Sequence, residues 1–191
     1  GLRQPSSGQV RLGGHEPSAL EGSALIHLAG LVPQEAADLL YSESVATECA
    51  LSDRDAGAVS GSTRALVDLL APEIEDDQHP RDLSEGQRLA LALAIVLAAS
   101  PPLVLLDEPT RGLDYQAKAR LATALRRLAH EGHGIVFATH DVELVAEVAT
   151  RVVVLADGEV VADGPTREVV IASPALAPQV AKILAPAPWL T

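Results

Sequence analysis

Apolar and polar positions along the chain fall into two alternating patterns. Short continuous apolar runs, typical of strands buried in a parallel sheet, stand at Leu103–Asp107 and Ile135–Thr139. Between them, Tyr115–Glu131 repeats apolar residues at helical spacing. The predicted buried face of that helix consists of Ala117, Leu121, Leu125 and Leu128. This alternation predicts an α/β fold with a mostly parallel sheet.

The first part of the chain predicts two further strands. The stretch GQVRLGG (Gly8–Gly14) alternates and is bounded by glycines, which indicates a strand with one exposed face. The stretch ALIHLAGLV (Ala24–Val32) indicates a second strand, and Pro33 ends it.

Helical patterns dominate the middle of the chain. Short helices are predicted around Ser42–Cys49 and Thr63–Leu70, in a region that is otherwise mixed and polar. Arg88–Ala99 predicts a strongly apolar helix, and burial against the sheet explains it better than membrane contact does. We therefore expect a small helical subdomain over about residues 35–100, within one domain that spans residues 1–172.

The last part predicts a helix, a hairpin and a tail. Val142–Ala149 has a helical pattern, and Asp141 is placed to cap it. In VVVLADGEVVADG, the Asp157-Gly158 pair is a strong signal for a hairpin turn. Residues 173–191 form a proline-rich C-terminal tail, with one possible helix at Ala175–Leu184.

Composition narrows the class of protein. A chain of 191 residues, 48% hydrophobic and only 2% aromatic, can bury one substantial aliphatic core. The formal charge of 14 − 26 = −12 argues against a nucleic-acid partner and against an anionic membrane surface. The single cysteine excludes an internal disulfide and fits a reducing compartment. No apolar run reaches the roughly 18 residues that a membrane-spanning helix needs.

The candidate chemistry begins where the strand LVLLDEPT ends in Asp107 and Glu108. The C-terminal edge of a parallel sheet is where α/β proteins bind ligands, and adjacent carboxylates suit Mg²⁺ and an activated water. The stretch LSEGQ precedes the apolar helix, so Ser84 and Gly86 lie where free backbone amides bind phosphate. An ordinary helix cap explains the same two residues. An isolated histidine, His140, ends another apolar strand in FATHD.

These stretches together resemble the motifs of the ATP-binding-cassette (ABC) ATPases, a branch of the P-loop NTPases. LSEGQR is similar to the signature motif, LVLLDEP to the Walker B strand with its catalytic glutamate, and GLD to the D-loop. ATHD is similar to the stretch with the switch histidine, and LVPQ to the Q-loop. The motifs come in the family's order, and the resemblance covers the chain from its first residue to about Val170.

The resemblance implies an ATPase that uses ATP and Mg²⁺ in transport. Asp107 and Gln34 would hold the metal, with Gln34 also sensing the γ-phosphate. Glu108 would act as general base or orient the attacking water, and His140 would contact the γ-phosphate.

The resemblance also implies partners. Ser84, Gly86 and Gln87 would bind the nucleotide of a second ABC ATPase subunit or domain in a head-to-tail dimer, and Asp114 would join the two sites. Glu85 departs from the glycine that is common there, and we expect its carboxylate to point away from the phosphates. Transmembrane transporter subunits would be further partners, which implies a cytoplasmic protein peripheral on the inner face of the cell membrane.

One stretch suggests the branch of the family. DLLYSESVATECA (Asp38–Ala50) resembles the segment after the Q-loop of cobalt and energy-coupling-factor importers, in which a coupling helix of the membrane subunit docks. The alternative is that its apolar residues simply pack the helical subdomain. The residues that match the importer pattern are Asp38, Leu40, Tyr41, Val45 and Glu48.

The phosphate loop of the family is not in the sequence. No G-x-x-x-x-G-K-[ST] occurs, and the only lysines, Lys118 and Lys182, lie in helical stretches without a glycine loop. Since the chain also contains no Met, we expect a sequence truncated before or at the end of the Walker A motif, without its N-terminal strand and phosphate loop. Such a chain would not hydrolyse ATP alone. An inactive cassette that serves as an interaction module, and a non-transport ABC ATPase, remain alternatives.

Other polar groups have simpler explanations. The loop Glu75–Asp77 is expected to be a solvated acidic loop rather than a cation site. The remaining histidines show no metal-ligand spacing with Cys49, so we expect surface or core positions for them. These histidines are His15, His27, His79, His130 and His133.

Overall fold

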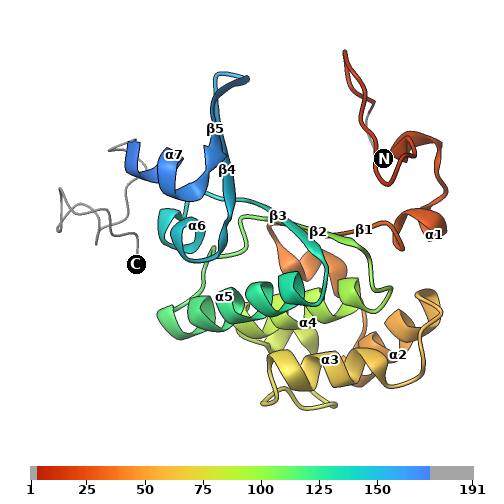
Figure 1. The fold of residues 1–191 in the computed structure, drawn as a ribbon. Helices are drawn as coiled ribbons and strands as arrows, with labels where there is room; N and C mark the ends of the chain where they lie inside the picture. Colours follow the sequence, from red (N-terminus) through yellow and green to blue (C-terminus); the bar gives the residue numbers. More distant parts are fainter. Residues whose placement is uncertain (1–3, 173–191) are drawn as a thin grey trace.

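The centre of the molecule is a three-stranded parallel sheet in the order β1-β2-β3 (Figure 1). The computed structural model describes residues 4–172. The strands are β1 (Ala29–Val32), β2 (Leu103–Asp107) and β3 (Gly134–Ala138). The structure therefore confirms the α/β class and both predicted apolar strands after residue 100.

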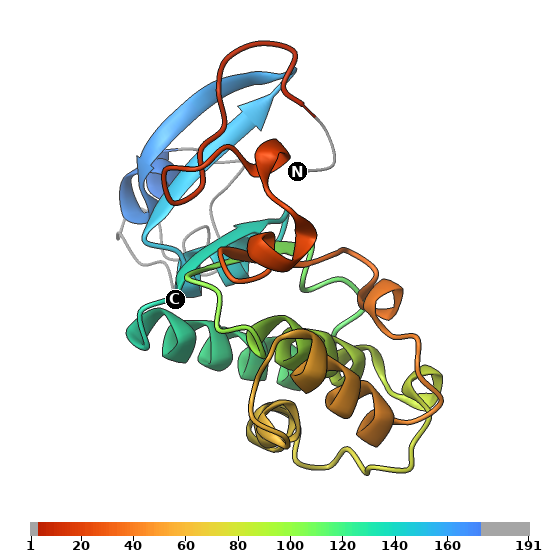
Figure 2. The ribbon, with the colours of Figure 1, turned by 90° about the vertical axis from the view of Figure 1, so that its right-hand side faces the viewer.

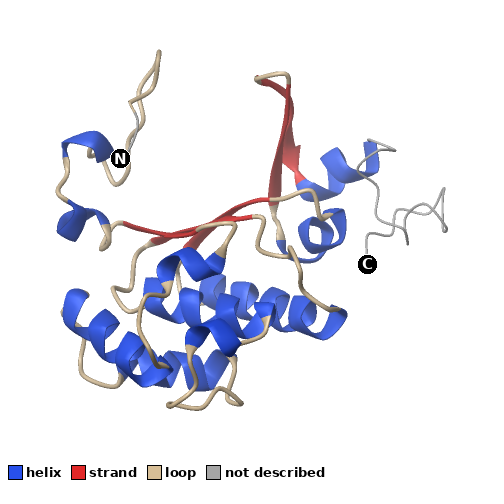
Figure 3. Ribbon diagram, turned by 180° about the vertical axis from the view of Figure 1, so that it is seen from behind, coloured by secondary structure: helices blue, strands red, loops and turns tan. Residues whose placement is uncertain are grey.

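Two helices, α4 (Glu85–Leu97) and α5 (Tyr115–His130), cover one face of this sheet (Figures 1 and 3). The predicted apolar helix is buried against the sheet, as expected, and all four predicted core positions of α5 are buried. The core between sheet and helices contains Val32, Ala36, Leu89, Ala92, Leu93, Leu97, Val104, Leu106, Leu121, Ala122, Leu125, Leu128 and Leu144.

The opposite face of the sheet carries apolar side chains in register. Leu31 pairs with Leu105, and Leu105 pairs with Val136. Leu31 and Val136 are 55% and 56% exposed. Among the described residues, no helix lies over this face; the hairpin and the segment before β1 stand at its two ends (Figures 1 and 2). Parallel sheets usually have both faces covered.

A second apolar cluster builds the helical subdomain. Helices α2 (Val45–Asp55) and α3 (Ser62–Leu70) pack with α4. Helix α2 begins later than predicted because Ser44 is its N-cap and accepts a hydrogen bond from the Thr47 amide at 3.2 Å. Buried residues of this cluster are Val45, Cys49, Val67, Ala71, Ile74, Leu83, Leu91 and Ala94. Burial raises the pKa of Cys49 to about 11, so this thiol stays protonated.

A buried carboxylate joins α2 to α3. Asp53 is 4% exposed and accepts hydrogen bonds from the Gly61 amide at 2.6 Å, the Thr63 amide at 2.8 Å and the Thr63 hydroxyl at 2.6 Å. Burial alone would raise the pKa of Asp53, but the hydrogen bonds from Thr63 and Gly61 outweigh it and hold the pKa below its ordinary value of 3.8. Asp53 is thus an ionised anchor for the start of α3.

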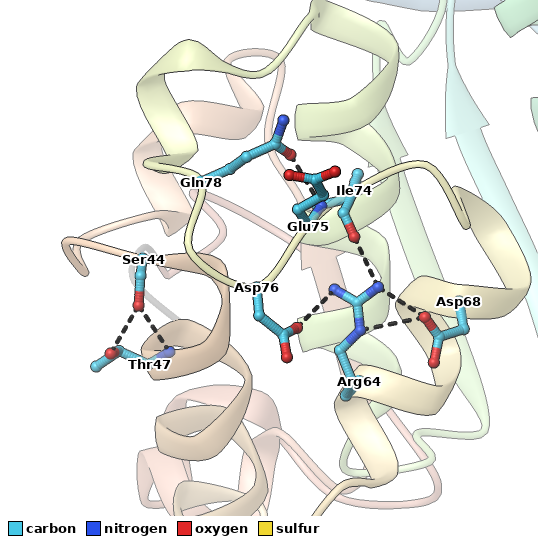
Figure 4. A network of polar contacts seen from close by, with 8 residues as sticks. All are labelled: Ser44, Thr47, Arg64, Asp68, Ile74, Glu75, Asp76 and Gln78. Carbon is cyan, nitrogen blue, oxygen red and sulfur yellow. Dashed lines mark hydrogen bonds and ion pairs between the residues drawn. The ribbon is translucent and has the colours of Figure 1, made fainter.

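The acidic loop is tied to α3 by Arg64 (Figure 4). The Arg64 guanidinium pairs with Asp68 at 2.6 Å and with Asp76 at 3.2 Å, and it donates to the Ile74 carbonyl at 2.8 Å. The Gln78 side chain accepts a hydrogen bond from the Glu75 amide at 3.0 Å, which closes the loop on itself. The acidic side chains are exposed, in agreement with a solvated loop.

The end of the described chain follows the prediction closely. Helix α6 (Val142–Val148) leads into the antiparallel hairpin of β4 (Arg151–Ala156) and β5 (Glu159–Pro165), and α7 (Thr166–Ala172) follows. The turn between β4 and β5 has φ of 52° and 82° at its Asp-Gly pair, the conformation that these residues favour. The sequence pattern did not predict α7, and the possible helix in the tail lies outside the described residues.

The prediction for the first part of the chain was partly wrong. Gly8–Gly14 forms no strand, because no neighbouring strand pairs with it. An isolated bridge joins Leu12 to His15 instead. The strand expected from Ala24 begins at Ala29, since α1 (Gly22–Leu25) is a helical turn. Between residues 4 and 172 there are also three short 3₁₀ helices: η1 (Pro17–Ala19), η2 (Ala36–Leu39) and η3 (Pro80–Asp82).

No helix in the described part of the chain combines the length and the apolar character needed to cross a membrane.

Candidate functional site

The three parallel strands bring the predicted site residues to one edge of the sheet. Asp107 pairs with Ala138, so His140 lies two residues beyond this pair and Glu108 one residue beyond it. Val32, at the end of β1, pairs with Leu106, which places Gln34 just past the same edge. The edge is the C-terminal end of all three strands, where α/β folds bind ligands.

Glu108 leaves the strand through an unusual backbone conformation. Its amide still donates to the Ala138 carbonyl at 2.8 Å, which extends the ladder by one residue. Its φ is 46°, in the left-handed region that costs a residue with a side chain about 1 kcal/mol or more. This turn ends β2 and directs the carboxylate away from the strand. Such strained residues are concentrated at functional sites.

The carboxylate of Glu108 forms a pair with His140. Its Oε2 lies 2.9 Å from His140 Nδ1 and accepts a hydrogen bond from the Thr139 hydroxyl at 3.3 Å. The hydrogen bond from His140 is the main cause that holds the pKa of Glu108 below its ordinary value, against the opposing effect of burial. Glu108 is therefore an ionised acceptor, and His140, 83% exposed, presents the rest of its ring to the space beyond the sheet edge.

Asp107 and Gln34 fit the needs of a magnesium ion. Both are exposed at the sheet edge and offer oxygen atoms, the ligands that Mg²⁺ prefers. No group of three or more His, Cys, Asp or Glu side chains within residues 4–172 is arranged as a metal site. Mg²⁺ at nucleotide sites needs only one or two carboxylates besides water and phosphate oxygens, so the small donor set is compatible with such an ion.

An ion pair joins the two loops that carry these residues. Arg111, in the loop after β2, pairs with Glu35, which follows Gln34. Both side chains are more than half exposed, so the pair adds little stability.

The signature-like stretch forms a helix cap. The Gln87 amide donates to Ser84 Oγ at 3.3 Å, and the Ser84 amide donates to Gln87 Oε1 at 2.9 Å, which is a capping box. The interpretation as an ordinary helix cap is therefore correct for this conformation. Ser84 is nevertheless exposed, and the first turn of α4 is open to solvent there.

Gly86 has a packing role that the sequence did not reveal. A Cβ atom on Gly86 would lie 3.0 Å from the Ala117 Cβ, so the glycine lets α4 approach the first turn of α5. The neighbouring Glu85 pairs with Arg88 on its own helix, and its Cγ would lie 3.2 Å from a Cβ placed on Gly112. The Glu85 carboxylate is thus held by Arg88, one turn further along α4.

Asp114 is the N-cap of α5. Its Oδ1 accepts a hydrogen bond from the Ala117 amide at 2.7 Å. The residue expected to join two nucleotide sites thus has a structural role within the chain, as the cap of the helical turn whose Ala117 contacts Gly86. In the described part of the chain no hydrogen bond or ion pair links Ser84 or Gln87 to Asp107 or Glu108, so the predicted residues form two separate groups.

The importer-like stretch divides into packed and exposed residues. Leu40 is half-buried against the second apolar cluster, whereas Tyr41 is 83% exposed. The carboxylate of Glu48, only 6% exposed, accepts hydrogen bonds from the amides of Tyr41 at 3.0 Å and Ser42 at 2.7 Å. Glu48 therefore fixes the loop that presents Tyr41 to solvent.

Three of the other histidines have side-chain partners in the described part of the chain, and the first, His27, has its Nδ1 3.3 Å from the Ala99 carbonyl. His133 Nδ1 lies 2.7 Å from the Pro101 carbonyl, and His79 Nδ1 accepts a hydrogen bond from the Arg81 amide at 3.0 Å. Each of these contacts holds a loop in place. His79 also lies 3.5 Å from Glu43, so its second ring nitrogen has a partner as well.

Comparison with known proteins gives a consistent set of matches. A family model described as "AAA domain, putative AbiEii toxin, Type IV TA system" matches residues 25–146. A putative ABC transporter ATP-binding protein of Streptomyces coelicolor is 65% identical over 191 residues, which is all of this chain and 34% of that protein. One of Pyrococcus abyssi is 34% identical over 164 residues, 84% of this chain and 63% of that protein. The chain thus spans about a third of the length of the Streptomyces relative.

Solved structures show the same fold. CbiO1 from Clostridium perfringens, part of the ABC transporter complex cbiONQ, is 28% identical with a TM-score of 0.77, over 98% of this chain and 76% of that one. An ATP-binding cassette in a dimeric post-hydrolysis state, bound to ADP and Pi, is 26% identical with a TM-score of 0.71, over 86% and 76%. The arrangement of β1–β3, α4 and α5 is therefore that of an ABC cassette.

Proposed function

This chain belongs to the ABC transporter ATP-binding protein family, and we propose on that premise that it provides the hydrolytic edge of an ATPase that energises an importer of the energy-coupling-factor or cobalt type. One observation carries the proposal: Glu108, ionised, lies 2.9 Å from His140 at the sheet edge, directly after Asp107. This pair has the chemistry that ATP hydrolysis requires at the position where the fold binds ligands.

Each residue at the edge of the sheet has a separate role in the proposed hydrolysis of ATP. Glu108 accepts the proton of the attacking water or orients that water, and its low pKa keeps it ready as an acceptor. His140 holds the carboxylate in place through Nδ1. A hydrogen bond from its exposed Nε2 edge to the γ-phosphate would use the doubly protonated ring, because Nε2 of the neutral ring is an acceptor. Asp107 and Gln34 would hold Mg²⁺, which neutralises charge on the phosphates when bound.

A second cassette would complete the site. Exposed Ser84 and the first turn of α4 offer free amides to a nucleotide held by a partner, in a head-to-tail dimer. Asp114 would join the two sites from its place at the start of α5. The dimeric state of the structural neighbour bound to ADP and Pi supports this arrangement.

Tyr41 supports the importer branch. It is a large side chain held in solvent by a buried carboxylate, in the stretch that resembles the docking segment of energy-coupling-factor importers. The likeness to cbiO1, part of the cbiONQ complex, supports the same branch. We accordingly place the protein on the cytoplasmic side of the membrane, in contact with transmembrane subunits.

A second function is favoured by one feature of this sequence. The 191 residues contain no G-x-x-x-x-G-K-[ST] and no lysine within a glycine loop. By itself the chain therefore lacks the amide nest and the lysine that hold the β- and γ-phosphates. In this form it would act as an interaction module that supplies Ser84 and its helix to a partner's nucleotide.

Comparing two forms of the protein tests both functions. The first form is the chain itself; the second, here called the fused cassette, is this chain with the phosphate-loop segment of a homologous ABC ATPase joined ahead of residue 1. Mg-ATP binding by calorimetry and phosphate release are measured for each. We expect neither binding nor turnover for the chain and both for the fused cassette. Micromolar binding with turnover by the chain would show that another phosphate site exists.

A further inference from the structure

Two ion pairs join α5 to α6, and they differ in what lies behind them. Lys118 Nζ lies 2.6 Å from Asp141 Oδ2, and Arg126 lies 2.9 Å from Glu147. Arg126 and Glu147 are both solvent-accessible; Arg126 lies about two helical turns beyond Lys118 on α5, and Glu147 lies near the end of α6. Asp141 is only 10% exposed in its side chain and directly follows His140. The Lys118–Asp141 pair thus lies beside His140 of the candidate site, whereas the Arg126–Glu147 pair does not.

Asp141 uses both carboxylate oxygens. Oδ2 accepts the hydrogen bond from Lys118, while Oδ1 accepts from the Glu143 amide at 3.2 Å and the Leu144 amide at 3.1 Å and so caps α6. Burial alone would raise the pKa of Asp141, but the hydrogen bonds from Lys118 and Leu144 outweigh it and lower the pKa. The carboxylate is held from two sides, which fixes the backbone at residue 141.

The same backbone is connected to the catalytic pair. The Asp141 amide donates to Thr139 Oγ1 at 3.0 Å, and the Thr139 hydroxyl donates to Glu108 Oε2 at 3.3 Å. His140, between these two residues, makes its own contact with that oxygen of Glu108 at 2.9 Å. Hydrogen bonds therefore connect Lys118 to the Asp141 side chain, the Asp141 amide to Thr139, and Thr139 to Glu108.

At its other end this network lies beside α4, the helix that begins in the signature-like stretch. Lys118 directly follows Ala117 in α5. The Ala117 Cβ limits how closely Gly86 can approach, and the Ala117 amide donates a hydrogen bond to Asp114 Oδ1. A movement of α4 against the first turn of α5 would displace Lys118 together with Ala117, because both lie on one rigid helical turn. The two groups of site residues, separate in their direct contacts, are joined through this lysine.

We propose that Lys118 is a positioning residue that, through Asp141 and Thr139, orients His140 toward Glu108 and couples the Gly86–Ala117 contact to the hydrolytic pair. The inference rests on the proposed function for its meaning in catalysis. The structural claim is that Lys118 sets the orientation of the His140 imidazole ring, and this orientation can be measured without ATP turnover. An ionised carboxylate can only accept a hydrogen bond, so the Glu108 contact requires the proton on Nδ1 of the neutral His140 ring.

The test observes that proton in the full chain labelled with ¹⁵N-histidine. Long-range ¹H–¹⁵N correlation at about pH 8.5, above the usual titration range of histidine, distinguishes a ring protonated on Nδ1 from one protonated on Nε2. We expect the Nδ1-protonated pattern for His140 in the native chain. In Lys118→Met and Lys118→Gln it should change to the Nε2-protonated or averaged pattern, and Lys118→Arg should restore it.

Arg126→Met is the matched control, because it removes the other ion pair between the same two helices. It should leave the His140 pattern unchanged. An unchanged pattern in both Lys118 variants, or an equal change in Arg126→Met, would overturn the proposal. Loss of folding in both Lys118 variants while Arg126→Met folds would also overturn it, since Lys118 would then be a stability element. A fused cassette without ATPase activity would contradict the proposed function and leave this result intact.

Discussion

At the scale of single residues, the sequence identified the residues of the candidate site more readily than the residues that hold them in position. Two carboxylates at the end of an apolar run predicted the sheet edge, because strand ends and ligand sites coincide in α/β folds. The contact between His140 and Glu108 could not be predicted, since it depends on the positive φ of Glu108 and on the Thr139 hydroxyl. Gly86 resembled an anion-binding glycine, yet its tightest contact is with Ala117 on a neighbouring helix.

Asp53 was not singled out by the sequence, and it yields the clearest pH prediction. Its folded-state pKa is lowered, so its stabilising effect is complete well above 3.8 and is lost as the pH falls through the folded-state pKa. At pH 7, Asp53→Asn should reduce the free energy of unfolding by about 1–3 kcal/mol, because charge-assisted hydrogen bonds to Gly61 and Thr63 are lost.

Urea unfolding of both proteins at a series of pH values checks this. The difference between native chain and variant should shrink steadily below the ordinary value of 3.8. Because both proteins carry the same other carboxylates, this difference isolates Asp53. A difference that stays constant down to low pH would show that the charge of Asp53 contributes nothing.

At the scale of elements, periodicity located the helices and strands, while their ends depended on local caps. Ser44, Ser84 and Asp141 begin helices where their side chains accept backbone hydrogen bonds. The strand predicted at Gly8–Gly14 failed because alternation indicates a half-exposed strand only when another strand lies beside it. Pairing partners are a property of the fold, which a local pattern does not contain.

Close packing of α4 on β1 gives a second prediction. A Cβ on Gly30 would lie 2.1 Å from Val96 Cγ1, so Gly30→Ala should lower the free energy of unfolding by about 1–3 kcal/mol through overpacking. Gly30→Ala combined with Val96→Ala should cost less than the sum of the two single changes. Gly22→Ala, at a glycine with open space around it, is the control and should have little effect. Strict additivity in urea unfolding would contradict the predicted contact.

The loop before α2 gives a third prediction, on docking. Tyr41→Ser in the fused cassette should weaken co-purification with the other components of a cbiONQ-type complex, because it removes an exposed aromatic anchor from the proposed interface. Basal ATPase activity should remain, since Tyr41 contacts no residue of the sheet edge in the described hydrogen bonds. Val59→Ser, at another exposed apolar residue, is the control. Equal recovery of the complex with Tyr41→Ser would exclude this loop as the docking site.

At the scale of the whole molecule, the sequence predicted the class of fold but not how its surfaces are used. The apolar runs indicated strands buried in a parallel sheet, yet Leu31 and Val136, which flank Leu105 on one face, are each more than half exposed in the described part of the chain. The resemblance had already assigned the site residues to two groups, one for each of two nucleotides. Their connection through Lys118 depends on the contact of α5 with α6 and on the approach of Ala117 on α5 to Gly86 on α4.

The central claim is that Glu108 is the catalytic base at the edge of the sheet. Steady-state ATPase activity of the fused cassette at saturating Mg-ATP tests it most directly, with Glu108→Gln compared against Glu159→Gln, an exposed glutamate of the hairpin. Glu108→Gln should keep ATP binding within a few-fold and lose about 10²–10⁴-fold in turnover, while Glu159→Gln should change neither. Turnover of Glu108→Gln within a few-fold of the unsubstituted cassette would contradict the account.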